Sequence, residues 1–232
     1  MHRLSVVALA SIIAMGGCSD DPVTGPGGDL ITLSASQAAS LVARVESFAV
    51  SDPTIGSISD TIEVVVKAGA EARRIEVTTD LGATEYYAVS LHMPNAQSVP
   101  ASATFHFIAF DDPNNPTRFI ILGGWSALGT GSDAPTVVSG PIGGATSTSL
   151  TGHLFSISGS QVSAWHASAG TVSFESSANG GACTGFTGPG TCVKGSMDVT
   201  FNLTSTVAGN GAAGERTASG SAVNVPGIRL TN

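Results

Sequence analysis

The sequence predicts a mainly β fold, an antiparallel β-sandwich or barrel of about ten strands with one amphipathic helix near the N-terminus. Three observations predict it. Apolar and polar residues alternate with a period of two from residue 61 onward. Short stretches rich in Gly, Pro, Asn, Asp and Ser separate the alternating segments. A helical period is clear in only one place, so repeated strand–helix units and a parallel sheet are not expected.

Residues 1–17 have the pattern of a secretory signal peptide. A positive start at Arg3 is followed by an almost wholly apolar run over 4–15 and then by small residues. The run is shorter than the roughly 20 apolar residues that a membrane-spanning helix needs. The segment Met15-Gly16-Gly17-Cys18 resembles the lipobox of bacterial lipoprotein signal peptides, with Met15 where that box usually has Leu.

This resemblance implies cleavage before Cys18, a thioether-linked lipid on its sulfur and acylation of the new N-terminus. Two or more acyl chains hold a protein stably on a membrane, so the membrane is the expected partner of Cys18. Ser19 follows the cysteine, which by analogy with enteric sorting favours the outer membrane over the inner one. Residues 18–29 are rich in Pro and Gly and are expected to form a flexible tether to a single β-rich domain, 30–232.

One helix is predicted over residues 35–49. Ser34 and Gln37 fit a capping box, in which each side chain satisfies the backbone N–H of the other. Ser51-Asp52-Pro53 is expected to end the helix. Its apolar stripe must pack against a sheet or over a barrel opening; the stripe consists of Ala38, Leu41, Val42, Val45 and Phe48.

The strands are expected to follow one another with tight turns, as in antiparallel hairpins. The clearest candidate is 194–206, where Met197, Val199, Phe201 and Leu203 share one face and polar residues the other. Residues 128–144 are rich in Gly and Pro and are expected to form a long loop. The candidate strands are 61–68, 73–79, 84–93, 102–110, 117–123, 147–158, 161–167, 170–176, 194–206 and 217–225.

Parts of the second half resemble small β-rich lipoproteins of Gram-negative bacteria. The similar segments are GTVSFES from Gly170, GSMDVTFNLT from Gly195 and VNVPGIRL around Pro226. Their motifs are generic hairpins. The resemblance therefore supports the fold class and implies no activity.

Composition excludes some partners. The chain has 9 Lys and Arg against 17 Asp and Glu, for a formal net charge of −8. Nucleic acid is not expected, because its binding needs a basic face. The same charge disfavours electrostatic docking on anionic lipids. Charged residues make up only 11% of the chain, well below the usual level of about 25%, as is typical of exported β proteins.

If Cys18 is lipidated, two cysteines remain. Export to an oxidising compartment favours a disulfide between Cys183 and Cys192. A Gly-Pro-Gly segment between them can turn the chain back, as the bond geometry requires. Two free thiols or a metal pair are the alternatives, but no further ligands lie at zinc-finger spacing.

Catalytic motifs fail on inspection, so no enzyme and no cofactor are predicted. Gly209–Gly214 matches the glycine pattern of dinucleotide-binding loops, but the residues after it predict a strand where that site needs a helix. Gly124–Gly129 has one residue too many for a nucleophile elbow.

Metal sites are weakly indicated. His92, His106, His153 and His166 each lie in a candidate strand, and a core role is favoured unless three of them converge. A loop with Asp111, Asp112, Asn114 and Asn115 has calcium-type oxygen ligands, but the same residue types favour any turn. We therefore predict no metal.

The only Tyr and Trp residues are Tyr86, Tyr87, Trp125 and Trp165. Their combination of apolar area and a polar tip suits ligand or partner surfaces, although the tryptophans are also natural core residues. The sequence thus favours a lipid-anchored cell-envelope protein that acts as a structural or protein-interaction module. The alternative is a carrier of a small apolar ligand in a barrel or sandwich cavity.

Overall fold

The computed structural model describes residues 29–51, 62–63, 65–66, 71–95, 102–127, 137–143, 148–178, 180–184, 186, 190–208 and 211–231. The predicted signal peptide, 1–17, and all of the predicted tether except Asp29 lie outside these residues. The elements are β1 (Leu30–Thr32), α1 (Ala35–Ser51), β2 (Glu71–Thr79), β3 (Glu85–Asn95), β4 (Ser102–Phe110), β5 (Arg118–Ala127), β6 (Val137–Pro141), β7 (Thr148–Ser158), β8 (Gln161–Ser177), β9 (Thr191–Val207) and β10 (Arg216–Thr231). The prediction of a mainly β protein with one N-terminal helix is confirmed.

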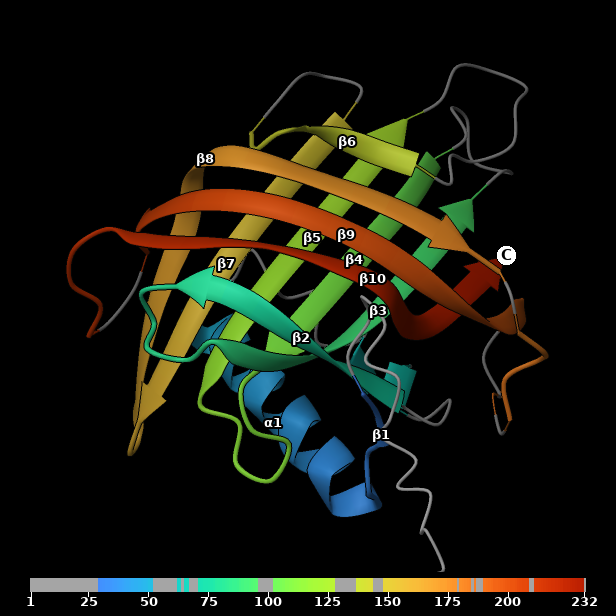
Figure 1. Ribbon diagram of the computed structural model, residues 1–232, viewed down its shortest axis with the longest axis horizontal. Helices are drawn as coiled ribbons and strands as arrows, with labels where there is room; N and C mark the ends of the chain where they lie inside the picture. Colours follow the sequence, from blue (N-terminus) through green and yellow to red (C-terminus); the bar gives the residue numbers. More distant parts are fainter. Residues whose placement is uncertain are drawn as a thin grey trace, which may run out of the picture.

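The sheet closes on itself. Strands β3, β4, β5, β7, β8, β9 and β10 pair in that order, each antiparallel to the next. β10 then pairs in parallel with β3, where Gly227 lies opposite Ser90. Of the two architectures compatible with the sequence, the pairings therefore form a barrel (Figure 1). β2 pairs with both β10 and β3, β1 extends the sheet beside β2, and β6 pairs with β8.

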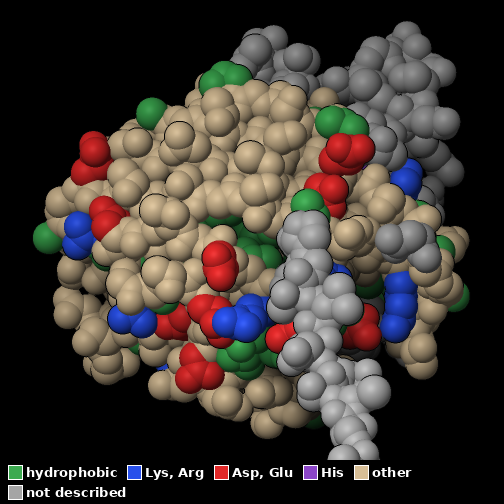
Figure 2. Space-filling view, viewed as in Figure 1, with side chains coloured by type: hydrophobic (Ala, Val, Ile, Leu, Met, Phe, Trp, Pro, Cys, Tyr) green, Lys and Arg blue, Asp and Glu red, His purple; other side chains and the backbone are tan. Residues whose placement is uncertain are grey.

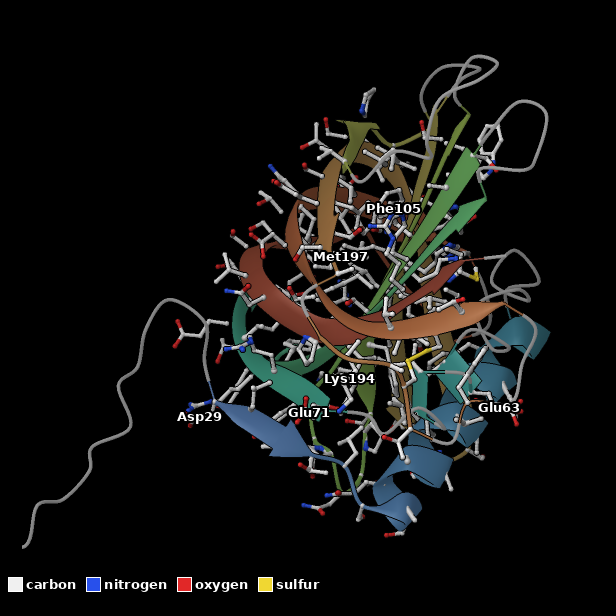
Figure 3. The ribbon with its side chains drawn as sticks, turned by 90° about the vertical axis from the view of Figure 1, so that its right-hand side faces the viewer. Asp29, Glu63, Glu71, Phe105, Lys194 and Met197 are labelled. Carbon is white, nitrogen blue, oxygen red and sulfur yellow. A yellow bond between two sulfur atoms is a disulfide. The ribbon has the colours of Figure 1, made fainter. Side chains whose placement is uncertain are left out.

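Apolar side chains fill the barrel interior. Successive residues of a strand face opposite sides, so alternate residues of the barrel strands point inward. Phe105 on β4 and Met197 on β9 lie in this core (Figure 3). Phe107, Phe174 and Phe201 belong to the same cluster and are buried.

A second core lies outside the barrel, under α1 (Figure 1). The ring of Phe48 stacks on Phe155 of β7 at 4.2 Å between centroids and meets Phe119 of β5 edge-on at 4.7 Å. Leu41 and Val45 of the helix are buried in the same cluster. The central strands are therefore apolar on both faces. Among the described residues, no helix has both the length and the hydropathy to cross a membrane.

The predicted helix start is confirmed. The backbone N–H of Ser34 donates to Oε1 of Gln37 at 2.8 Å, and the N–H of Gln37 donates to Oγ of Ser34 at 3.2 Å. This reciprocal pair is a capping box, which satisfies donors that the first helical turn leaves open.

The expected strand at 61–68 is wrong in its described part. Residues 62–63 and 65–66 are helical, and Ile62 and Val65 are buried in the outer core. Their spacing of three places both side chains on one face of a helix, whereas a strand would have turned them to opposite faces.

Three other strand predictions change. The candidates 161–167 and 170–176 form the single strand β8, with a register shift between Ala167 and Ala169. The expected loop over 128–144 contains β6, whose pairing with β8 a local pattern does not reveal; 128–136 and 144 lie outside the described residues. The candidate 217–225 extends to Thr231 as β10.

In their described parts, the two glycine motifs lack the helix that a dinucleotide-binding loop or a nucleophile elbow needs. Gly214 leads directly into β10 at Arg216, so the described part of the glycine-rich segment connects strands and opens no helix. Gly124 lies within β5, where a Cβ would come 2.8 Å from Cε2 of Phe174. This glycine therefore makes room for an aromatic ring of the core and does not form a strand-to-helix elbow.

Candidate functional site

The four Tyr and Trp residues do not form one site. Tyr86 and Trp165 are buried in the inner core, whereas Tyr87 packs against the outer core. Trp125 is 39% exposed. Tyr86 and Tyr87 are neighbours in β3, so the pleat of the strand sends them to opposite faces.

Trp165 has a structural role near one end of the barrel. Its Nε1 donates to the carbonyl oxygen of Gly214 at 3.1 Å, and the guanidinium carbon of Arg216 lies 5.2 Å from its ring centroid. Such a cation–π contact stabilises the fold by about 0.5–1 kcal/mol when exposed. The contacts hold the segment before β10 against β8 and leave the ring packed in the core.

Tyr86 places a hydroxyl in the apolar interior. The residue is fully buried, and within the described part of the chain its hydroxyl has no hydrogen-bond partner. Burial raises the pKa of this phenol, and the negative charge of Asp111 raises it further. Tyr86 is therefore neutral across the physiological range.

Tyr87 lines an acidic recess on the outside of the barrel. Its hydroxyl donates to Oε1 of Glu85 at 3.3 Å, and Glu85 also forms an ion pair with Arg74. Burial, together with the charge of Glu85, raises the pKa of Tyr87. The recess is about 420 Å³, within the range of small-ligand sites. Its lining also includes Ile31, Thr32, Gln37, Asp111, Asp112, Pro113 and Asn114.

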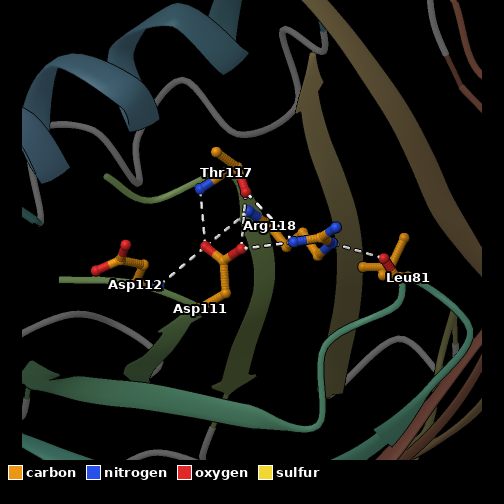
Figure 4. A network of polar contacts seen from close by, with 5 residues as sticks. All are labelled: Leu81, Asp111, Asp112, Thr117 and Arg118. Atoms are coloured by element: carbon orange, nitrogen blue, oxygen red, sulfur yellow. Dashed lines mark hydrogen bonds and ion pairs between the residues drawn. The ribbon is translucent and has the colours of Figure 1, made fainter. Parts of the chain in front are cut away.

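The calcium candidate is a hydrogen-bonded turn (Figure 4). Oδ1 of Asp111 accepts from the backbone N–H groups of Asp112, Thr117 and Arg118 at 2.7–3.0 Å. Its Oδ2 accepts from the Thr117 hydroxyl at 2.7 Å and from Arg118 at 3.0 Å. Burial alone would raise the pKa of Asp111, but the hydrogen bonds from Thr117 and Arg118 hold it below its usual value. The carboxylate oxygens are thus engaged in closing the turn.

Arg118 joins this turn to the next one. Its Nε donates to the carbonyl oxygen of Leu81 at 2.6 Å, in the turn between β2 and β3 (Figure 4). Asn114, also in the β4–β5 loop, accepts at Oδ1 from Gln37 of α1 at 3.0 Å. The loop therefore connects the barrel to both the helix and a neighbouring turn.

A polar recess lies beside the barrel interior, at His92. Nδ1 of His92 is hydrogen-bonded to Oγ of Ser176, and the imidazole stacks on Phe105 at 4.4 Å. The recess has essentially no room for a water molecule, whereas small-ligand sites typically hold about 300 Å³ or more. Serine and histidine are two members of the catalytic triad of serine hydrolases. The third member is a carboxylate, and none lies among the residues that line this recess.

The other histidines lie on the outer face. His153 and His166 are directly opposite each other on β7 and β8, with ring centroids 4.5 Å apart. His106 lies on β4, and burial lowers its pKa to about 4. Among the described residues, no three His, Cys, Asp or Glu side chains are placed to hold a metal ion. The register of the β7–β8 hairpin determines which of the histidines meet.

The predicted pairing of cysteines is supported. Cys183 and Cys192 form a disulfide, with Cα atoms 5.4 Å apart. The backbone N–H of Cys183 also donates to the carbonyl oxygen of Cys192 at 3.0 Å. The bond attaches the segment after β8 to the start of β9. Cys18, the expected lipidation site, lies outside the described residues.

Charged side chains gather unevenly on the surface. Figure 2 shows a broad face over β8, β9 and β10 on which uncharged polar side chains and backbone predominate, with Lys, Arg, Asp and Glu grouped around β2.

No family model matches the chain, and no curated protein or solved structure is detectably similar to it.

Proposed function

We propose that this protein is a lipid-anchored module of the bacterial cell envelope with a structural or protein-interaction role and no catalytic activity. The observation that carries the proposal is the segment Met15-Gly16-Gly17-Cys18 directly behind a short apolar run. Lipid on Cys18 would hold the barrel at a membrane through its acyl chains, with the outer membrane favoured by Ser19.

The first described residues are consistent with a tether that joins the barrel at its surface. The carbonyl oxygen of Asp29 accepts from the backbone N–H of Arg74 at 2.9 Å, and β1 pairs with β2 directly afterwards. The Asp29 carboxylate lies 4.0 Å from the Arg74 guanidinium (Figure 3). A chain anchored at Cys18 would therefore connect to the barrel through β1, leaving the rest of the surface for contacts.

Two exposed features suit a protein partner. Trp125 exposes part of its large ring on the outer face of the barrel. The recess at Tyr87 is lined by the ring of this tyrosine together with carboxylates and amides. Aromatic side chains contribute much of the binding energy at protein interfaces. The structural or interaction role rests on these surfaces.

The anchor is tested by expressing the full chain and its Cys18→Ala variant in bacteria fed an alkyne-labelled fatty acid. We expect the wild type to incorporate label and to sediment with membranes. The variant should lose both properties but keep its β-type circular dichroism spectrum. Ser19→Ala is the control and should retain the label. Membrane retention of Cys18→Ala through high-salt washes would refute lipid anchoring.

The alternative function, a carrier of a small apolar ligand, is favoured by closure of the barrel. The aromatic filling of the described interior weighs against it. Native mass spectrometry of the exported chain separates the two functions. A bound mass that disappears on denaturation supports a carrier. A bare mass, lighter by the two hydrogens lost in the disulfide, supports the interaction module.

A further inference from the structure

We propose that His153 and His166 together form a binding site for a divalent transition-metal ion such as Zn²⁺ or Cu²⁺. The two residues are directly opposite each other on neighbouring antiparallel strands. Both side chains project from the outer face of the barrel, beyond Phe155 and Ala164, which pack in the core under α1. The site is independent of the recess at Tyr87 and of the proposed lipid anchor.

The separation of the rings fits coordination of one ion. A zinc ion bonded to one nitrogen of each ring at about 2.1 Å lies about 3.2 Å from each ring centre. The tetrahedral angle of zinc, about 109°, then places the ring centres about 5.2 Å apart, and the right angle of tetragonal copper coordination places them about 4.5 Å apart. The observed centroid distance is 4.5 Å, with the planes inclined by 46°. Inclined rings can direct one nitrogen each toward a common point, whereas parallel stacked rings cannot.

The surroundings hold one ligand in place and leave the other accessible. His153 is 1% exposed, and its ring is nearly parallel to that of Phe155, 6.3 Å away. Phe155 in turn is stacked on Phe48 of α1. His166 is half-buried, so an ion can approach from its side. The next strand on each side contributes an uncharged residue, Ile121 opposite His153 and Thr206 opposite His166.

The chemistry of the donors selects the metal. Neutral imidazole suits zinc, copper and nickel and is a poor ligand for calcium or magnesium. The Irving–Williams order places Cu²⁺ above Zn²⁺ for such nitrogen ligands. Since the described residues supply no third His, Cys, Asp or Glu, water would complete the coordination shell. Such a site exchanges its ion more readily than a closed structural zinc site does.

The test is isothermal titration of the purified full chain with zinc chloride. Cys18→Ser is present in every protein, so that the cysteine thiol does not bind zinc. We expect one zinc ion per chain in the reference protein and an affinity at least about ten-fold lower in His166→Ala. The matched control is His106→Gln, which removes another outer-face histidine and should leave the affinity unchanged.

Two observations guard against an effect of misfolding. His166 is half-buried, so its replacement by Ala is expected to leave the barrel folded, and the circular dichroism spectrum checks this. Electron paramagnetic resonance of the Cu²⁺-loaded reference protein should show coupling to two imidazole nitrogens, and to one in His166→Ala. The proposal is overturned if zinc does not bind, if folded His166→Ala binds as tightly as the reference, or if His106→Gln weakens binding equally.

Discussion

The carboxylate of Asp111 closes the β4–β5 turn and holds the side chain of Arg118, which reaches the carbonyl oxygen of Leu81. Because these hydrogen bonds lower its pKa, Asp111 stabilises the fold at neutral pH. The sign follows from the depressed pKa in the folded state. The contribution is present above the pKa of the unfolded chain and is lost as the pH falls through the lower folded-state value.

We therefore predict that Asp111→Asn destabilises the protein at pH 7 by roughly 1.5–3 kcal/mol, the usual range for hydrogen bonds to a charged group. The difference from wild type should shrink on acidification, because the wild-type carboxylate then becomes neutral. Urea unfolding at a series of pH values measures both effects. Asp112→Asn is the control, since that exposed side chain caps only the N–H of Asn114 and an amide oxygen can still accept. Equal losses in the two variants would contradict this role for Asp111.

The aromatic candidates show what residue-level patterns can predict. A period of two already requires Tyr86 and Tyr87 to face opposite sides, so their separation could have been predicted from the sequence.

The meeting of His153 and His166 could also have been predicted from the sequence. The two-residue turn Gly159-Ser160 pairs Ser158 with Gln161, and counting back along the hairpin gives the histidine pair. Their depth of burial depends on α1 and on other packing that a hairpin does not specify.

At the level of elements, prediction succeeded where local signals were complete. The strand 102–110 and the capped start of α1 were predicted correctly, because alternation and capping both involve adjacent residues. The strand expected at 61–68 failed because the apolar residues of so short a segment fit two periods. Ile62, Val64 and Val66 alternate as in a strand, whereas Ile62 and Val65 have the spacing of a helix. β6 was missed because Gly and Pro are typical of loops, and this edge strand forms by pairing with β8, which is distant in the sequence.

The packing of α1 should depend strongly on Phe48, which is fully buried between Phe119 and Phe155. Phe48→Ala removes the ring and leaves a cavity that the rigid barrel wall cannot fill, so we expect a loss of about 3–5 kcal/mol in unfolding free energy. Glu46→Ala, on the exposed side of the same helix, should change it by about 0.5 kcal/mol or less. Urea denaturation of the two variants measures the contrast. If Phe48→Ala proves as mild as Glu46→Ala, α1 contributes little to the stability of the barrel.

At the scale of the whole molecule, the sheet closes because β10 changes its pairing partner along its length. Its first half pairs with β2 and its last residues pair with β3. Between them Asn224 has φ 53°, its N–H donates to Asp198 at 2.6 Å, and its carbonyl oxygen accepts from Arg73 at 2.9 Å. The candidate strand stopped at residue 225 because alternation breaks at this kink. The parallel seam joins residues more than a hundred positions apart, so no local pattern could reveal that the sheet closes.

Closure of the barrel should therefore be sensitive to one glycine in that seam. A Cβ on Gly227 would lie 2.0 Å from the carbonyl oxygen of Ser90, so β10 and β3 must separate to accept any side chain. We predict that Gly227→Ala lowers the free energy of unfolding by about 1–3 kcal/mol, the usual range for overpacking. The substitution should also weaken amide-exchange protection selectively in β3 and β10. Gly181→Ala is the matched control, because a Cβ there meets no atom within 4 Å. Hydrogen exchange read by mass spectrometry locates the effect. If protection fell evenly over all strands, or if both variants behaved alike, the seam would not be the contact that holds the barrel closed.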